Sequence, residues 1–232
     1  MLSENEILRL SANLRIDRER IVREFYEMLV LNEIAANLWS QWLVFKGGTA
    51  LRLAYQSPRF SDDLDFVLTQ SIPTSDIFRL ADQTANKFTL QISDKSEKKS
   101  TILIEYKISP PELPQSFHIK IEISKRIQPA IKSELKIISS PVCSLQILMP
   151  VLTMENMIEE KISAWNQRKA PRDLFDLWFL SQKTQRSFSK MIQKLTIVSE
   201  DRASLRSEMN KYLPLNWRQV IDEMDQIIQR NQ

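Results

Sequence analysis

Two aspartates, Asp63 and Asp65, stand two residues apart in the segment FSDDLDFVL. On a strand such positions point the same way, so both carboxylates would share one face. Carboxylates this close repel each other unless a cation neutralises them. Paired Mg²⁺ or Mn²⁺ ions would do so while clamping the attacking and leaving oxygens of phosphoryl or nucleotidyl transfer. Taken alone, such a pair is more often a solvated strand end, but Leu64, Phe66 and Leu68 predict an anchored strand, which favours the metal interpretation.

The only two glycines of the 232 residues are adjacent, Gly47 and Gly48, in the run WLVFKGGTALRLAY. The residues before them predict a strand, and those after them predict a helix. At such a junction glycines let backbone N–H groups approach a phosphate, which the helix dipole also favours. Thr49 would then cap the helix or bind phosphate through its hydroxyl. A tight turn packed against the sheet is the alternative, because the glycine pair alone is a weak signal.

The segment 117–124 alternates between apolar and polar residues, which is typical of a strand with one buried face. Glu122 lies on its polar side. A third carboxylate from a neighbouring strand would complete a two-metal site, whereas an ordinary solvent-facing glutamate is the alternative. Glu105 is a weaker rival for that place, because it too faces away from the apolar side of its strand.

Two charged residues fall within apolar helical patterns near the end of the chain. Lys161 has apolar neighbours one turn away, including Trp165, so it either snorkels to the edge or reaches a phosphate. Asp176, in LFDLWFL, needs a partner because its surroundings are apolar. A helix ion pair with Arg172 is one possibility. The functional alternative is that Asp176 orients Lys161 or Arg168 in an active site.

The composition excludes several function classes. His118 is the only histidine and Cys143 the only cysteine, which excludes disulfides and zinc sites with several imidazoles. Any metal would be held by oxygen, which favours magnesium or manganese. There is no GxSxG motif, no apolar run long enough to span a bilayer and no secretion signal. We therefore expect a cytoplasmic protein without a membrane partner. The net charge of +3 is compatible with nucleic acid.

The hydrophobic pattern predicts mixed α/β elements first and helices afterwards, with a boundary near 140–152.

Four basic residues of the helical part recur at helical spacing and would form a stripe for RNA phosphates, or else a solvated helix face. These residues are Lys183, Arg186, Lys190 and Lys194. The expected elements are helices over 3–38, 49–55 and 75–87, strands over 42–45, 64–68, 89–94, 101–108 and 117–124, and helices from 152 onward.

Two separated segments, FKGGTALRLAYQSPRFSDDLDF and EEKISAWNQRKAPRDLFDLWFL, resemble the nucleotidyltransferase AbiEii toxin family. The family belongs to the DNA polymerase β-like nucleotidyltransferase superfamily and includes abortive-infection and MenT-like toxins. The resemblance implies an α+β fold, in which a polymerase β-like mixed sheet core with flanking helices precedes a helical C-terminal region. Residues 1–150 would hold the N-terminal helices and the nucleotidyltransferase core, and residues 151–232 would form the helical region that completes the active site.

The resemblance also implies roles for single residues. Those with catalytic roles are Asp63, Asp65, Lys161 and Asp176, and those that hold metal are Asp63, Asp65 and Glu122. Those that bind the nucleotide are Lys46, Gly47, Gly48, Thr49, Arg59, Ser61 and Lys161. The implied reaction transfers a nucleoside monophosphate from an NTP and releases pyrophosphate. For MenT-like members the acceptor is the tRNA 3′ end, and the partner is a cognate antitoxin.

Other functions remain open at this point. One alternative is a nucleotidyltransferase that modifies a small molecule or a protein, and another is a non-catalytic nucleotide-binding protein. Loss of one aspartate would favour the latter, and both are present. The residues by themselves indicate metal-dependent phosphoryl or nucleotidyl transfer.

Overall fold

The computed structural model describes residues 2–231, which separate into two compact units. The first unit contains the residues up to Gln56 together with Phe60–Leu152. The second contains the short segment Ser57–Arg59 and the residues from Thr153 onward. The domain ranges predicted from the sequence also include residues 1 and 232, which lie outside the described part.

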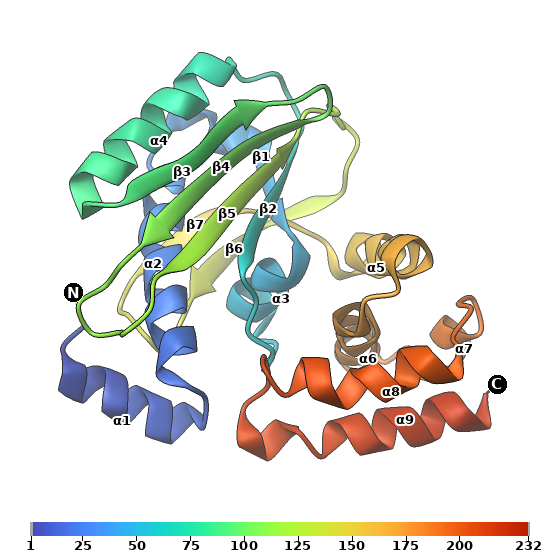
Figure 1. Ribbon diagram of the computed structural model, residues 1–232. Helices are drawn as coiled ribbons and strands as arrows, with labels where there is room; N and C mark the ends of the chain where they lie inside the picture. The colour runs from blue at the N-terminus through green and yellow to red at the C-terminus, as the bar shows by residue number, and fades with distance from the viewer. Residues whose placement is uncertain (1, 232) are drawn as a thin grey trace. The chain divides into compact units, whose positions relative to one another are not determined.

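Within residues 2–231, seven strands form one mixed sheet in the order β3-β4-β5-β2-β1-β7-β6 (Figure 1). The central strand β2 runs antiparallel to β1 and parallel to β5, and β1 is also parallel to β7. The predicted α+β class, with a mixed sheet and flanking helices, is confirmed. The strands are β1 (Leu43–Lys46), β2 (Asp63–Leu68), β3 (Gln91–Glu97), β4 (Thr101–Ile108), β5 (Phe117–Ser124), β6 (Ser133–Ser139) and β7 (Gln146–Leu152).

The helices of the first unit begin where the sequence offers caps. Ser3 and Glu6 form a capping box at the start of α1, and Asp17 accepts a hydrogen bond from the Arg20 backbone at the start of α2. Helices α2 and α4 contact each other and pack against the sheet (Figure 1). The bounds are α1 (Glu4–Leu14), α2 (Arg18–Ala35), the 3-10 helix η1 (Leu38–Trp42), α3 (Gly47–Tyr55) and α4 (Thr74–Phe88).

Alternation along the strands builds the core of the first unit. Leu64 and Phe66 of β2 are fully buried, and Phe66 stacks on Phe45 of β1 at 5.1 Å between ring centroids. The isoleucines of β4 and β5 are buried as their two-residue period predicted. Because each such side chain contributes about 1.5–3 kcal/mol on burial, this face fixes the strands that carry the polar residues opposite.

Two strands, β6 and β7, were not expected from the sequence. Ile147, Met149 and Val151 of β7 are buried in alternation, but Pro150 interrupts that run. A proline removes a ladder donor and usually argues against a central strand. Here β7 meets β1 only near Val151 and otherwise pairs with the edge strand β6. The segment is therefore part of the sheet, although its composition resembles a connection.

The second unit is helical, as predicted from residue 152 onward. Pro171 occupies the first turn of α6, where its missing N–H is tolerated. No helix in the described part of the chain is long and apolar enough to cross a membrane. The helices are α5 (Met154–Arg168), α6 (Pro171–Thr184), α7 (Phe188–Ile192), α8 (Ser199–Met209), the 3-10 helix η2 (Leu215–Trp217) and α9 (Val220–Arg230).

The expected basic stripe along one helix is wrong. Helix α6 ends at Thr184, and the following Gln185 adopts a left-handed conformation with φ of 54°. Helix α7 has only five residues. Lys183 is therefore on one helix and Lys190 on another, with Arg186 in the loop between them. The sequence spacing fitted a helix, but the chain turns in the middle of it.

Candidate active site

The glycine pair lies at the junction of β1 and α3, as the sequence predicted. Gly47 has φ of +80°, a conformation that L side chains rarely adopt. A Cβ atom at this position would overlap with Oδ2 of Asp65 and lie 3.2 Å from its Cβ and Cγ atoms. The Asp65 carboxylate therefore lies against the first residue of α3. The positive end of the helix dipole favours a negative charge at this place.

Thr49 neither caps the helix nor points its hydroxyl at an open surface. It is buried, and its Oγ1 donates a hydrogen bond of 2.5 Å to the backbone oxygen of Asp63. The cap position of α3 is Lys46, which makes no side-chain capping bond. Thr49 thus joins the first turn of α3 to the start of β2, and this contact holds the Gly47 turn and the aspartate strand together.

Asp63 and Asp65 lie on the half-buried face of β2, while Leu64 and Phe66 fill the core behind them. The parallel pairing of β2 with β5 places Lys120 beside Asp63 and Glu122 beside Asp65. Adjacent strands lie about 4.8 Å apart, so these four side chains share one small surface. We call this surface the acidic face.

The register also separates the two candidates for the third carboxylate. Glu122 is on the strand next to Asp65, whereas Glu105 pairs with Lys120 and is one strand farther from Asp63. The Glu105 carboxylate accepts a hydrogen bond of 2.7 Å from Ser93. Glu122 is therefore the nearer of the two to the aspartate pair.

Lys120 is a residue of the acidic face that the sequence reasoning did not select. Its ammonium forms an ion pair with Glu122. The hydrogen bond to Glu122 raises the pKa of Lys120 against the opposing effect of partial burial, and the charges of Glu122, Asp63 and Asp65 raise it further. The signal was available, because Lys120 and Glu122 alternate onto the same side of β5.

The donor set of the acidic face suits a hard divalent cation, since its three carboxylates come from two paired strands. Over the described residues, no group of three or more His, Cys, Asp or Glu side chains is arranged to hold a metal ion. The Lys120 ammonium gives a physical reason, because it already pairs with Glu122 and attracts both aspartates. The residues thus fit a metal by chemical type and by strand position, but their side chains are not gathered around one point.

In the second unit, Lys161 and Asp176 belong to a buried network of ion pairs. Lys161 Nζ lies 2.6 Å from Oδ2 of Asp176 and 3.2 Å from Oδ1 of Asp173. Arg59 holds Asp176 through two bonds of 2.8 and 2.9 Å, and Arg168 holds Asp173 through two of 2.8 and 2.9 Å. Both aspartates are completely buried. This arrangement provides the partner that a buried carboxylate needs.

The charges in this network decide the protonation of Asp176. Burial alone would raise the pKa of its carboxyl, but the positive charges of Arg59 and Lys161 and their hydrogen bonds hold that pKa below the ordinary value. Of the partners that the sequence left open for Asp176, Lys161 is the one that pairs with it, and Arg59 is a partner that the sequence did not indicate. Asp173, three residues before Asp176 on α6, completes the network.

Of the other predicted nucleotide-binding residues, Lys46 is aligned with Asp65 across β1 and β2 and is half-buried. Ser61 is half-buried just before β2 in the first unit, whereas Arg59 belongs to the second unit. The first unit thus brings together Lys46, Gly47, Asp65 and their strand neighbours, and the second unit brings together the buried ion pairs.

The chain was compared with known families and structures. The family described as "Nucleotidyl transferase AbiEii toxin, Type IV TA system" matches residues 29–228. JHP933 from Helicobacter pylori is 22% identical with a TM-score of 0.61, over 93% of each chain. MenT4, a nucleotidyltransferase toxin from Mycobacterium tuberculosis H37Rv, is 17% identical with a TM-score of 0.61, over 99% of this chain and 90% of that one.

At these identities the solved structures are evidence for the fold alone. The comparison with curated proteins gave no match. The family match is stronger evidence, because it covers most of the chain. It includes the Gly47 turn, the aspartate strand and the segment of α6 from Arg172 to Asp176. This chain therefore belongs to the nucleotidyl transferase AbiEii toxin family and is a nucleotidyltransferase.

Proposed function

We propose that the chain is the toxin of a toxin–antitoxin system and transfers a nucleoside monophosphate from an NTP to RNA, with the tRNA 3′ end as acceptor. The observation that carries the proposal is the acidic face. Asp63 and Asp65 share one side of β2, Glu122 lies beside them on β5, and Gly47 leaves room for the Asp65 carboxylate at the start of α3. A cytoplasmic location follows from the need for NTP and RNA, and the expected protein partner is a cognate antitoxin.

The acidic face would hold Mg²⁺ or Mn²⁺ through Asp63, Asp65 and Glu122. When bound, the metal would neutralise charge on the transferring phosphoryl group and orient the attacking and leaving oxygens. The protein contributes a rigid support, because the apolar side of β2 is buried and Thr49 fixes the backbone at Asp63. Binding a cation also relieves the mutual repulsion of the carboxylates.

For the nucleotide, the proposal assigns the turn at Lys46, Gly47 and Gly48 to the triphosphate. The first backbone N–H groups of α3 have no partner within their own helix, which makes this end suited to anions. We also keep the roles that the family resemblance implies for four further residues. Arg59, Ser61 and Lys161 would bind the nucleotide, and Lys161 and Asp176 would have catalytic roles. Within the second unit, ion pairs with Asp176 and Asp173 hold the Lys161 ammonium in place, which suits a lysine that contacts phosphate.

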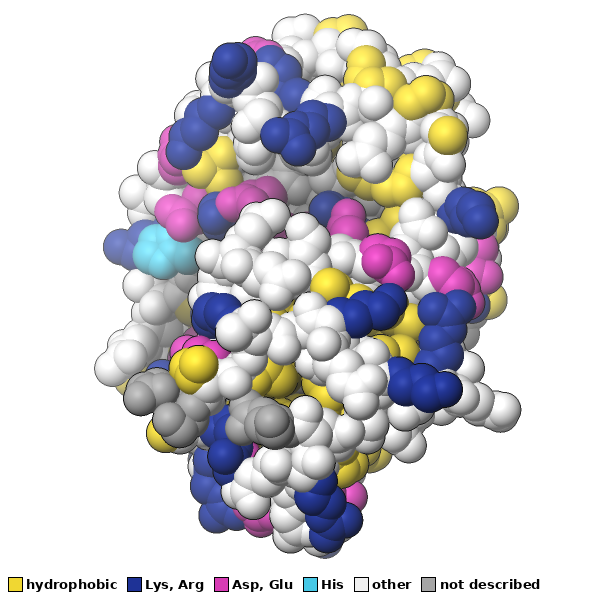
Figure 2. All heavy atoms as spheres, turned by 90° about the vertical axis from the view of Figure 1, so that its right-hand side faces the viewer, with side chains coloured by type: hydrophobic (Ala, Val, Ile, Leu, Met, Phe, Trp, Pro, Cys, Tyr) yellow, Lys and Arg dark blue, Asp and Glu magenta, His cyan; other side chains and the backbone are white. Residues whose placement is uncertain are grey.

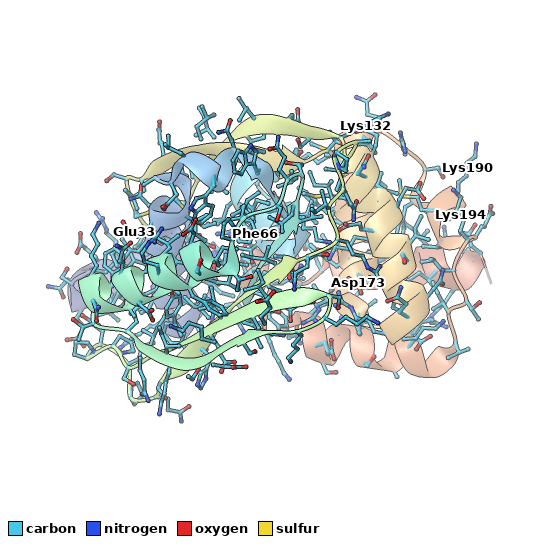
Figure 3. All side chains as sticks on the ribbon, turned by 90° about the horizontal axis from the view of Figure 1, so that it is seen from above. Glu33, Phe66, Lys132, Asp173, Lys190 and Lys194 are labelled. Carbon is cyan, nitrogen blue, oxygen red and sulfur yellow. The ribbon has the colours of Figure 1, made fainter. Side chains whose placement is uncertain are left out.

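The choice of RNA as acceptor has weaker physical support than the transfer itself. The predicted basic stripe does not exist as one helix face, so the support comes from the family and from exposed basic residues of the second unit. Lys190 and Lys194 are both exposed and project from the second unit in Figure 3. The acceptor therefore has to be determined by experiment.

The test incubates the purified protein with each α-labelled NTP, Mg²⁺ and total RNA at low salt. We expect label on tRNA, and none when the tRNA 3′ end is first oxidised with periodate. Glu122→Gln should lower the rate strongly, as should Asp63→Ala, while Glu105→Gln serves as the matched control and should keep it. Label that appears only on protein or on a small molecule such as an aminoglycoside would refute the RNA acceptor. An Asp63→Ala protein with the wild-type rate would refute the metal site.

A further inference from the structure

A cluster of charged residues on α2 meets the chain just before the aspartate strand. Arg20 forms an ion pair with Asp62, the residue that immediately precedes Asp63. Arg23, one turn later, places its Nε 3.5 Å from the same carboxylate oxygen. Both arginine side chains are nearly buried, with exposed fractions of 12% and 9%. Two guanidinium groups therefore converge on one carboxylate.

Arg23 also contacts the start of the neighbouring strand. Its Nη1 donates a hydrogen bond to the backbone oxygen of His118, and its guanidinium lies 4.6 Å from the ring centre of Phe117. Its Nη2 donates a bond of 3.0 Å to Glu19, which holds the side chain from the other side. The planar fork of arginine allows these contacts at once, whereas a lysine would offer a single ammonium.

These contacts occur where the pairing of β2 with its neighbours ends. The pairing of β2 with β5 begins at Asp63, and the pairing of β2 with β1 reaches only Asp65. Asp63 therefore has a strand partner on one side alone. Asp62 and His118 both lie just beyond the first pair of the β2–β5 ladder. The Arg23 side chain contacts both of them and so links the two strands at this end.

Apart from Glu19, which pairs with Arg23, the acidic residues Glu24 and Glu27 of α2 are not equivalent partners for these arginines. Glu24 is paired with Arg52 at 2.8 Å and accepts a hydrogen bond from Ser140. Burial, with a smaller effect of Glu24, raises the pKa of Glu27 well above its ordinary range, which favours an uncharged side chain. Asp62 is thus the carboxylate that receives both Arg20 and Arg23.

We infer that Arg20 and Arg23 are positioning residues for the acidic face, because they fix the starts of β2 and β5 relative to each other. β2 carries Asp63 and Asp65, and β5 carries Glu122. The inference rests on the proposed metal site and adds the groups that set the spacing of its ligands. Outer groups that orient metal ligands commonly change metal affinity by 10–100-fold when they are lost.

The sign of the effect separates positioning from simple electrostatics. Arg23→Gln removes a positive charge near the acidic face, so Coulomb attraction alone would make Mn²⁺ bind more tightly. Positioning predicts the reverse, namely weaker binding by about 10-fold or more. Arg23→Lys keeps the charge but loses the fork, so charge alone predicts no change and positioning again predicts weaker binding. The lysine variant also decides the question if the glutamine variant fails to fold.

The experiment measures Mn²⁺ binding to the full chain by electron paramagnetic resonance, together with thermal melting and steady-state kinetics. Glu33→Gln is the matched control, because Glu33 is also on α2 but pairs with Lys87 of α4 at 2.8 Å (Figure 3). It should lose some stability and keep wild-type Mn²⁺ binding. The Arg23 variants should bind Mn²⁺ more weakly and show a lower kcat with little change in KM for NTP.

Two results would overturn the inference by itself: an Arg23→Lys protein that binds Mn²⁺ like the wild type, or an Arg23→Gln protein that binds it more tightly. The proposed metal site, and this inference with it, would instead be refuted by either of two results. The wild-type protein binds no Mn²⁺, or the Asp63→Asn protein binds Mn²⁺ with the same affinity as the wild type. The two failures are therefore distinguishable in one set of titrations.

Discussion

At the scale of single residues, several polar groups of the candidate site hold one another in place. The Thr49 hydroxyl is bonded to the backbone of Asp63, and the Lys120 ammonium is paired with Glu122. Gly47 is required because the Asp65 carboxylate occupies the space of a side chain. The residues selected for chemistry are thus embedded in contacts that fix their geometry.

Gly47→Ala should disturb both stability and activity. The new Cβ would overlap with the Asp65 carboxylate, and the φ of +80° is unfavourable for alanine. We expect a loss of about 1–3 kcal/mol in the free energy of unfolding and a large loss of kcat, measured by urea denaturation and labelling assays. Gly48→Ala is the control for stability, because it lies in α3 and alanine favours helix. An equal effect of both substitutions on unfolding would contradict the role given to Gly47.

Lys161→Met tests whether the lysine serves the nucleotide or only the network. Methionine keeps the apolar stem and removes the charge, so Asp176 and Asp173 would keep only Arg59 and Arg168 as cations. If Lys161 contacts phosphate, the variant should have a lower kcat/KM for NTP. The drop should correspond to a loss of transition-state stabilisation on the order of a few kcal/mol. Steady-state kinetics beside a melting curve decide between the roles. Unchanged kinetics with a lowered Tm would make Lys161 a structural residue.

At the scale of elements, charge contributes to the pairing of α5 with α6 in the second unit. Lys161 and Arg168 come from α5 or its end, and Asp173 and Asp176 come from α6. Exchanging a buried ion pair for well-packed apolar residues is often neutral, but removing one partner typically costs 3–5 kcal/mol. The network therefore specifies how these helices pair more than it adds net stability.

Asp176→Asn should destabilise the protein in a way that depends on pH. The pKa of Asp176 is lower in the folded chain than its unfolded value of about 3.9, so its contribution is present above that pH and is lost as the pH falls through the folded pKa. We expect a loss of roughly 3–5 kcal/mol at pH 7 that shrinks below about pH 4, measured by urea unfolding across this range.

Asp225→Asn is the matched control for that experiment. Asp225 pairs with Arg202 at 2.7 Å, but both side chains are partly exposed. Such pairs contribute about 0–1 kcal/mol, so this variant should lose little stability at any pH. A pH-independent loss in Asp176→Asn would show that packing, not charge, explains its effect.

At the scale of the whole molecule, the face drawn in Figure 2 carries its positive charge in several places rather than in one. On the face drawn in Figure 2, Lys and Arg side chains form several separate groups, with Asp and Glu side chains among them. The net charge is only +3. On this face, an RNA contact would therefore depend on a few local groups and not on one continuous basic surface.

The double charge reversal Lys190→Glu with Lys194→Glu tests this view. If these exposed lysines contact RNA phosphates, labelling of RNA should fall, and the salt dependence of RNA binding should become less steep, because fewer counterions are released. The KM for NTP should stay near the wild-type value. Lys98→Glu with Lys99→Glu makes the same charge change in the turn between β3 and β4. If both pairs lower RNA labelling equally, net charge rather than a local contact is responsible.

Much of the fold follows from local patterns. The capping box at Ser3, the alternation of β5 and the apolar spacing of the early helices all predicted elements that the structure confirms. Strands β6 and β7 did not follow, since Pro150 masks the alternation and their pairing partners are distant in sequence. The helix break at Gln185 also escaped, because helical spacing does not reveal a left-handed residue.

The sequence by itself determined the chemical types and their local geometry: two aspartates on one face of a strand, a glycine turn before a helix, and too few histidines and cysteines to build a metal site from them. Only the tertiary structure decided which side chains meet. The β2–β5 register put Lys120 among the carboxylates, and the tertiary structure selected Lys161 over Arg172 as a partner of Asp176 and added Arg59. The physical reason is that strand register and ion pairing depend on residues far apart in the chain, which local periodicity does not encode.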